Sequence, residues 1–568
     1  MNNKNNAVYK NQKRYASNTT GNSSAPKYNY NPHRHTKIWL SNNPNLFLNL
    51  ENQIRLIKMR EQNPDDIIHL IYDSSLLAVK AVDELNIFCA ENNIIPLDAD
   101  LFTPQLLSTK QCQLYEFYKD EIRHLKEGGN LAVASDILRW LYPVYKNGTY
   151  ADFDFPITTS ALPETIEVES PLLLNIGSLK LGKKEFILSN NDFVAIVDHE
   201  AAKDMIERVQ QGLLNRLTKY DTDFVQKTEK KLQDNFFNRN LLKLMRNRSE
   251  TFYISKSKDI HKPSITSRAL RKYVREIMSD KSKFLEFSRK NTEETHADII
   301  QRLREDLKKQ CTLVKRLFFS KEYTEIKETL RQDNEFFLHY LMNKELNLYI
   351  KSIIVCTTGP IQISNALFKD YVVDIPTFAA KIQPLSFNHY HLQKSFRSQN
   401  SIPMHESILG MMRFLGANEG EVNDSSWLES GQILQEQRVK KLEQIRNELA
   451  LSLPHSLLKL KLDITLQINK LSKVSMFKKS KNAQKEALER ILACFHNELF
   501  DIKEFETVLM SLDFVLTGVF PNQTKKLIYS LKKLCGNAVI FRLAQNRKIK
   551  LPAHTNNNAF PHTLAYVH

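Results

Sequence analysis

The chain has 568 residues and a mass of 66.1 kDa, with 42% apolar and 25% charged residues. This size and composition exclude a single small module and predict about two to four domains with substantial cores. Lys and Arg number 80 against 64 Asp and Glu, so the formal net charge is +16. Such an excess suits a nucleic acid, an anionic membrane or an acidic protein as partner.

The first 34 residues are rich in Asn, Ser and Lys and lack the apolar core of a secretory signal. We therefore predict a disordered arm over residues 1–34. No apolar run reaches about 18 residues, so the sequence predicts no transmembrane span. The six cysteines form no C-x-x-C pair and no zinc-ligand spacing, which favours a reducing, cytoplasmic location.

A β–α–β unit is predicted after the arm. His35–Leu40 is the first strand, Leu46–Glu61 has the apolar spacing of a helix, and Ile67–Tyr72 is an apolar second strand. A right-handed crossover makes the two strands parallel, and ligands of open α/β sheets lie beyond the carboxyl ends of such strands. Trp39 and Asp73 fall at these ends. Trp39 suits stacking on a flat heterocycle or a core position, and Asp73 suits a ligand contact or a turn cap.

The segment Gly129–Phe155 is the most informative part of the chain. Its first half has an apolar helical pattern that carries Asp136 and Arg139 three residues apart. This spacing places both side chains on one face of the helix. After a turn, Thr149–Ala151 is predicted as a short buried strand.

Two carboxylates, Asp152 and Asp154, follow this strand at alternate positions, which share a face. Hard oxygen ligands with open positions between them suit Mg²⁺ or Mn²⁺ that bridges a diphosphate. The sequence therefore predicts a metal-bound sugar nucleotide here. A helix cap followed by a solvated acidic turn is the alternative.

These motifs resemble those of the glycosyltransferases in large clostridial cytotoxins and related bacterial effectors. The matching runs are Ser135–Arg139 and Tyr150-x-Asp152-x-Asp154, in the family's order and near its spacing. The resemblance implies a Rossmann-like α/β core of the GT-A type that transfers a sugar with retention of anomeric configuration. It implies contacts of the sugar nucleotide with Asp136, Arg139, Tyr150 and Asp152, and metal ligation by Asp154 and Asp152.

The first predicted strand and two downstream segments extend the resemblance. Trp39 stands where the family's Trp packs on uracil, although Thr36 and Ser41 depart from its pattern. Lys351–Pro360 is predicted as a strand stopped by a Thr-Thr-Gly-Pro turn, with a helix after it; a plain strand-to-helix turn is the alternative. Asn423–Trp427 resembles the mobile loop that closes over the sugar diphosphate. Donation to the departing phosphate is therefore expected of Ser425 and Trp427, and a capped helix start is the alternative.

The predicted fold class is α/β, with a GT-A-like core, a large helical insertion and an all-helical C-terminal domain for a partner or a membrane. Basic clusters such as Arg268–Arg275 fit either a solvated helical face or a surface that docks on a target protein or membrane. The predicted domains are the arm at 1–34, the core at 35–200 and 348–430, the insertion at 201–347, and the C-terminal domain at 431–568.

The sequence thus predicts a metal-dependent glycosyltransferase that uses a UDP-hexose or UDP-N-acetylhexosamine and modifies a protein hydroxyl. A small GTPase or another host protein is the expected acceptor, reached in a host cell without a classical signal peptide. A glycan-building mannosyl or galactosyl transferase is one alternative. A non-catalytic basic scaffold or nucleic-acid binder is the other, and only the charge supports nucleic acid.

Overall fold

The structure is a computed structural model that describes residues 26–219, 266–318, 320–369 and 372–396, together with shorter stretches between 433 and 550. Its contacts divide the chain into two compact units. The first comprises residues 1–38, 65–71 and 97–420, and the second comprises residues 39–64, 72–96 and 421–568. Each unit is considered by itself.

A mixed β-sheet runs through the first unit in the order β4-β3-β2-β5-β8-β7, with β9 paired on β8. The predicted parallel pair is confirmed, because β2 pairs parallel with both β3 and β5. The chain then reverses, and β8 pairs antiparallel with β5, β7 and β9. The strands are β2 (Arg34–Ile38), β3 (Ile67–Tyr72), β4 (Ile95–Asp98), β5 (Thr149–Ala151), β7 (Leu172–Leu181), β8 (Lys184–Ile196) and β9 (Val372–Asp374).

A tight hairpin joins β7 to β8. Leu181 pairs with Lys184, and Gly182 has a φ of +64°, a left-handed conformation that glycine adopts without steric cost. Farther along, the register passes from the pair Asn175–Asn190 to the pair Leu174–Val194, so residues 191–193 of β8 form a bulge. A bulge of this kind re-aims side chains out of the regular alternation of a strand.

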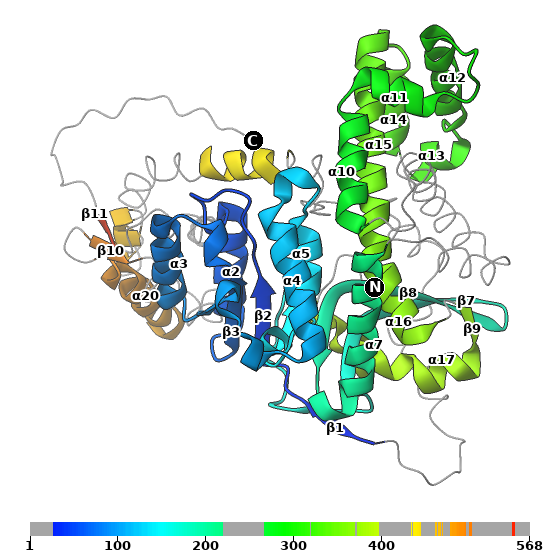
Figure 1. The fold of residues 1–568 in the computed structure, drawn as a ribbon. Coiled ribbons are helices and arrows are strands. Elements are labelled where there is room, and N and C mark those ends of the chain that lie inside the picture. Colours follow the sequence, from blue (N-terminus) through cyan, green and yellow to red (C-terminus); the bar gives the residue numbers. More distant parts are fainter. Residues whose placement is uncertain are drawn as a thin grey trace, which may run out of the picture. The chain divides into compact units, whose positions relative to one another are not determined.

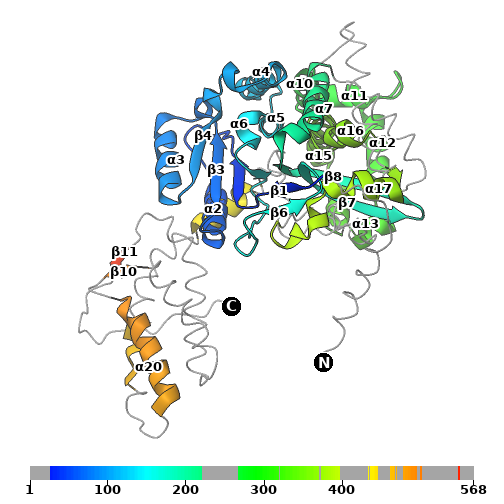
Figure 2. The same cartoon turned by 90° about the horizontal axis from the view of Figure 1, so that it is seen from below.

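Helices surround this sheet in the first unit. Helix α4 packs on α5, α7 packs on α4 and α16, and α10 runs beside α15 (Figure 1). Figure 2 shows α15, α16 and α7 together on one side of the strands. The helices are α4 (Thr109–Arg123), α5 (Leu131–Leu138), α6 (Tyr142–Tyr145), α7 (His199–Thr218), α10 (Ser267–Met278), α11 (Lys281–Ser288), α12 (His296–Lys309), α13 (Leu313–Phe318), α14 (Ser320–Thr329), α15 (Asn334–Thr357), α16 (Pro360–Phe368) and α17 (Ile375–Lys381).

Short 3₁₀ helices connect several of these elements, and capping side chains fix the starts of many α-helices. Asp198 begins α7, Thr266 begins α10 and Asp333 begins α15, each by accepting a backbone N–H of the first turn. The 3₁₀ helices are η2 (Ser74–Leu76), η3 (Ala99–Leu101), η4 (Pro104–Leu106), η5 (Leu125–Glu127), η6 (Gln383–Leu385), η7 (Phe387–Tyr390) and η8 (Leu392–Lys394).

The predicted strand at Lys351–Pro360 is wrong. These residues form the last turns of α15, a helix of 24 residues, and the start of α16. A short apolar run with β-branched residues fits a buried helix as well as a buried strand, and here the long apolar pattern upstream extends the helix. The helix predicted after the Thr-Thr-Gly-Pro turn is confirmed as α16.

The end of the predicted disordered arm is also structured. Strand β1 (Tyr28–Tyr30) pairs antiparallel with β6 (Ile166–Val168), and the side chain of Tyr30 is buried. Its hydroxyl shares a hydrogen bond of 2.8 Å with Thr149 Oγ1. Burial of the Tyr30 ring against the sheet outweighs the polar composition of the surrounding segment. Residues 1–25 lie outside the described part of the chain.

The second unit contains α2 (Leu50–Gln62), α3 (Val79–Glu91), α20 (Lys478–Ala493) and a strand pair, β10 (Leu499–Asp501) with β11 (Lys548–Lys550). Arg438 lies 3.2 Å from Glu51 on α2, so a C-terminal residue contacts an element of the N-terminal half. Because β10 and β11 form an antiparallel pair, the C-terminal region is not all-helical as predicted.

No helix in the described ranges is long and apolar enough to cross a membrane. Five cysteines in these ranges are free thiols, in agreement with the absence of pairing patterns in the sequence.

Candidate active site

Helix α5 positions the first site residues. The side chain of Asn130 accepts hydrogen bonds from the backbone N–H groups of Ala132 and Val133 and so caps the helix. Asp136 lies in the last turn, and Arg139 is the C-cap residue. Both are almost fully buried, and Arg139 Nη2 lies 3.1 Å from Asp136 Oδ1. The predicted juxtaposition of these two side chains is therefore confirmed.

Strand β5 brings Tyr150 and Asp152 to the same place. Tyr150 is buried on the strand, and its hydroxyl donates a hydrogen bond to Asp152 Oδ1. Lys37 Nζ on β2 donates to the backbone oxygen of Asp152 over 2.7 Å, which fixes the chain where it leaves the sheet. The Asp152 side chain remains 39% exposed and can reach a ligand.

Arg139 connects the helix to the strand. Its guanidinium carbon lies 4.2 Å from the centre of the Tyr150 ring, and Nη2 lies 3.8 Å from Asp152 Oδ1. Stacking on a tyrosine face and a fork of N–H donors are properties of arginine that lysine does not share. The structure therefore gathers four predicted site residues, Asp136, Arg139, Tyr150 and Asp152, into one cluster.

Two further residues contact Asp136 and were not predicted for this role. Asn191 Nδ2 donates to Asp136 Oδ1 over 2.8 Å, and Thr358 Oγ1 donates to Oδ2 over 2.7 Å. Asn191 also accepts a hydrogen bond from Arg139 through its backbone oxygen. The signal for Asn191 is the polar run Ser189–Asp192 between the apolar runs Phe186–Leu188 and Phe193–Ile196. Thr358 lies in the Thr-Thr-Gly-Pro turn noted in the sequence.

The β8 bulge explains how Asn191 reaches the cluster. Asp192 is buried, and the amides of Asn175 and Asn190 donate to its two carboxylate oxygens, each over 2.8 Å. Its backbone oxygen accepts the N–H of Asp152 over 3.0 Å. The bulge is thus held on both sides, and Asn191 is directed at Asp136.

Burial and charge act in opposite directions on Asp136. Burial raises the pKa of its carboxyl to about 6, although the Arg139 guanidinium and the hydrogen bond from Thr358 lower it. The charge of Asp152 adds to the rise. Burial also raises the pKa of Tyr150 well above its ordinary value, so the phenol stays protonated and donates to Asp152. Asp136 therefore takes up a proton as the pH falls through about 6.

The carboxylates that follow β5 are ligands of the type that hard divalent cations prefer. Within the described ranges, no group of three or more His, Cys, Asp or Glu side chains is placed to hold a metal ion. Mg²⁺, however, is commonly held by one or two carboxylates, substrate phosphates and water. Asp152 is partly exposed, and Asp154, two residues on, is half-buried. These two carboxylates match that mode of binding.

The other predicted residues belong to the second unit or lie outside the described residues. Trp39 follows β2 directly and is half-buried, in the second unit. Asp73, in the same unit, is buried and caps η2 by accepting the Ser75 N–H over 2.9 Å. Its cap role is therefore established, and a ligand contact stays a prediction. Ser425 and Trp427 lie outside the described residues.

Comparisons with known proteins identify the family to which the chain belongs. Among solved structures, the PaToxG glycosyltransferase is similar at 20% identity and a TM-score of 0.25, over 34% of this chain and 62% of that one. This chain thus spans less than two thirds of that chain's length. No curated protein matches. The model of glycosyltransferase family 88 matches residues 21–389, well over half of the sequence. The chain belongs to glycosyltransferase family 88.

Proposed function

We propose that this chain transfers a hexose or N-acetylhexosamine from a UDP-sugar to a hydroxyl group of a protein, with Mg²⁺ or Mn²⁺ as cofactor. The observation that carries the proposal is the buried cluster in which Arg139 bridges Asp136 and Asp152. The Arg139 guanidinium lies between the buried carboxylate of Asp136 and the accessible carboxylate of Asp152. This arrangement suits a ligand that carries both sugar hydroxyls and phosphates.

In this proposal Asp136 accepts hydrogen bonds from the sugar. Each of its oxygens already accepts one hydrogen bond, from Asn191 or from Thr358, and a carboxylate oxygen has two lone pairs. Because Arg139 Nη2 also contacts Oδ1, the acceptor site that remains for a sugar hydroxyl is on Oδ2. Arg139 holds the carboxylate in this orientation and directs its remaining donors toward the phosphates.

Asp152 and Asp154 would hold the metal and the ribose side of the donor. When bound, the ion neutralises negative charge on the diphosphate leaving group. Tyr150 orients Asp152 through its hydroxyl, which leaves the second carboxylate oxygen of Asp152 available to a ligand. Trp39 is proposed to stack on the base, and Ser425 and Trp427 to donate to the departing phosphate.

The acceptor and the setting rest on the motif resemblance to cytotoxins and bacterial effectors. It supports a protein acceptor, such as a small GTPase or another host protein, in the host cytoplasm, and transfer with retention of configuration. The free thiols favour a reducing compartment. An anionic membrane is a second proposed partner. The described structure offers no specific support for nucleic acid.

Calorimetric titration of the purified chain with UDP-sugars, with and without Mn²⁺, tests the site directly. We expect metal-dependent binding of one donor that is lost in Asp152→Asn/Asp154→Asn. Asp306→Asn on α12 is the matched control, because its side chain is 42% exposed, close to the 39% of Asp152. Metal-independent binding, or equal loss in the control, would contradict the proposal.

A further inference from the structure

Helix α10 lies against the loop that leads into α5, the helix of Asp136. Gly128, in this loop, has a φ of +94°. A Cβ atom at Gly128 would lie 2.7 Å from the backbone nitrogen of Lys272 and would also collide with the backbone oxygen of Arg268. The loop and the α10 backbone therefore approach each other as closely as glycine permits.

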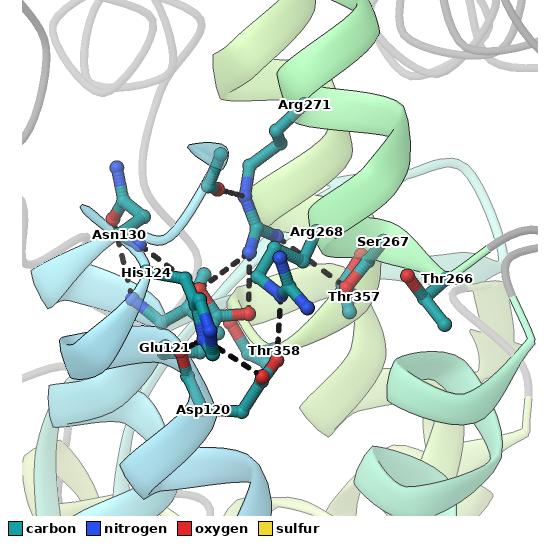
Figure 3. A network of polar contacts seen from close by, with 12 residues as sticks. Asp120, Glu121, His124, Asn130, Thr266, Ser267, Arg268, Arg271, Thr357 and Thr358 are labelled. Atoms are coloured by element: carbon teal, nitrogen blue, oxygen red, sulfur yellow. Dashed lines mark hydrogen bonds and ion pairs between the residues drawn. The ribbon is translucent and has the colours of Figure 1, made fainter. Parts of the chain in front are cut away.

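Arg271 on α10 is fully buried at this contact. Its Nε donates to the Gly128 backbone oxygen over 2.9 Å, and its Nη2 contacts both carboxylate oxygens of Glu121, one of them at 2.6 Å (Figure 3). Glu121 on α4 is also buried. A buried ion pair with this geometry fixes the two helices and the loop in one arrangement.

The same Glu121 carboxylate extends the contact to α5. Its Oε2 accepts the backbone N–H of Asn130 over 2.9 Å, and Asn130 is the residue whose side chain caps α5. A continuous series of hydrogen bonds thus runs from Arg271 through Glu121 and Asn130 into the helix that carries Asp136.

The C-terminal end of α5 contacts the end of α15, the helix that packs on α10. Helix α10 packs along α15 (Figure 1). Thr358, the C-cap residue of α15, donates through its hydroxyl to Asp136. The α10–α15 pair is therefore connected to both ends of α5, through Glu121 to the N-cap Asn130 and through Thr358 to Asp136.

The basic segment Arg268–Arg275 consequently serves a contact within the chain. Arg268 Nε lies 2.6 Å from Asp120 Oδ2 (Figure 3). Arg275 Nη1 donates to the Leu125 backbone oxygen over 3.2 Å. These partners, together with Glu121, come from α4 and the loop after it. A wholly solvated face therefore does not describe this segment, and docking on a target protein or membrane stays a prediction.

We propose that Arg271 is a positioning residue for sugar transfer: through Glu121 and Asn130 it sets the place of α5, and with it the Asp136 carboxylate beside Arg139. This inference rests on the proposed function. A displacement of about 1 Å at a reacting group can lower a rate about a hundredfold, so a remote arginine can control kcat.

The test compares three variants by donor hydrolysis and thermal unfolding. Arg271→Met leaves Glu121 buried without its cation, so both stability and kcat should fall. In Arg271→Met/Glu121→Met the buried charge is gone and stability should recover, since a buried ion pair can be replaced by apolar side chains at little cost. In this double variant the backbone N–H of Asn130 has lost its Glu121 acceptor, so kcat should stay about a hundredfold low while KM for the donor changes less.

Arg302→Met is the matched control. Arg302 also makes a two-pronged pair, with Glu294 at 2.8 and 3.2 Å, and donates to a backbone oxygen, that of Ser288. It lies on α12, which packs on α11 and α14 in the described structure. Its replacement should lower stability and leave kcat and the acid limb of the pH–rate profile unchanged, whereas Arg271→Met should move that limb.

The outcomes separate the two proposals. Turnover in the wild type and in Arg302→Met, with kcat recovered alongside stability in the double variant, would overturn the positioning role alone. An equal fall of kcat in Arg302→Met would do the same. Absence of turnover in the wild type with every donor would overturn the proposed function.

Discussion

The hydroxyl of Thr358 donates a hydrogen bond of 2.7 Å to Oδ2 of Asp136, a residue 222 positions earlier in the chain. Both side chains are buried. This bond joins the turn after α15 to the last turn of α5. The hydrogen bond also favours the ionised form of Asp136, because a donor to a carboxylate oxygen stabilises the negative charge.

Replacement of Thr358 by Val should move the acid limb of the kcat/KM profile. We expect Asp136 to work as a carboxylate, so wild-type activity should fall below about pH 6, where its pKa lies. Loss of a donor to the charged form raises this pKa further, and the limb should move up by about one pH unit. Thr357→Val is the control, because Thr357 Oγ1 donates to Ile353 O within its own helix. An equal displacement in both variants would contradict the assignment.

Asp136→Asn should abolish transfer and change the pH dependence of stability. The folded pKa of Asp136, about 6, lies above the ordinary value of 3.8, so the native state binds the proton more tightly than the unfolded state. This contribution is complete below about pH 4 and is lost as the pH rises through 6. Denaturant unfolding should therefore show the stability of the wild type relative to the variant falling by about 2 kcal/mol between pH 4.5 and 7.5. A constant difference would mean that Asp136 titrates normally.

Tyr150→Phe should weaken the donor site without removing the stacking surface beneath Arg139. The lost hydroxyl holds Asp152 in place, and one such hydrogen bond contributes about 1 kcal/mol, so kcat/KM should fall about five- to tenfold. Steady-state kinetics with the preferred donor measure this change. Tyr145→Phe, in the same unit, serves as comparison, since its hydroxyl contacts His199 instead. Unchanged kinetics in Tyr150→Phe would remove Asp152 from donor binding.

Trp39→Ala should raise the apparent KM for the nucleotide sugar and leave kcat nearly unchanged. Stacking on an indole contributes on the order of 1 kcal/mol, which corresponds to a change of about fivefold to tenfold. Trp39→Phe should recover part of the loss because it keeps an aromatic face. If Trp39→Ala unfolds the protein and Trp39→Phe shows no effect on the donor constant, Trp39 is a core residue.

The local part of the site could be predicted from the sequence. Asp136 and Arg139 are one helical turn apart, and Tyr150 and Asp152 are one strand repeat apart, so helix and strand periodicity alone orient each pair. Ile67–Tyr72 was predicted with its observed bounds because its apolar run is short and ends at a polar turn.

The remaining part depends on contacts distant in sequence. Asn191 reaches Asp136 through the bulge in β8, whose position follows from the register with β7. The end of α15 has the composition of a strand and forms a helix because the preceding turns extend through it. Arg271 is buried by an acidic partner on α4, 150 positions away, and an amphipathic basic helix by itself does not distinguish such a partner from solvent.

The most direct test of the central claim is the release of free nucleoside diphosphate. The purified chain is incubated with a panel of UDP- and GDP-sugars and Mn²⁺, with and without chelator, beside Asp152→Asn/Asp154→Asn and the Asp306→Asn control. We predict release from one donor, abolished by chelator and in the double variant and retained in the control. Release that persists with chelator or in the double variant, or no release from any donor, would contradict a metal-dependent sugar-nucleotide site at these aspartates.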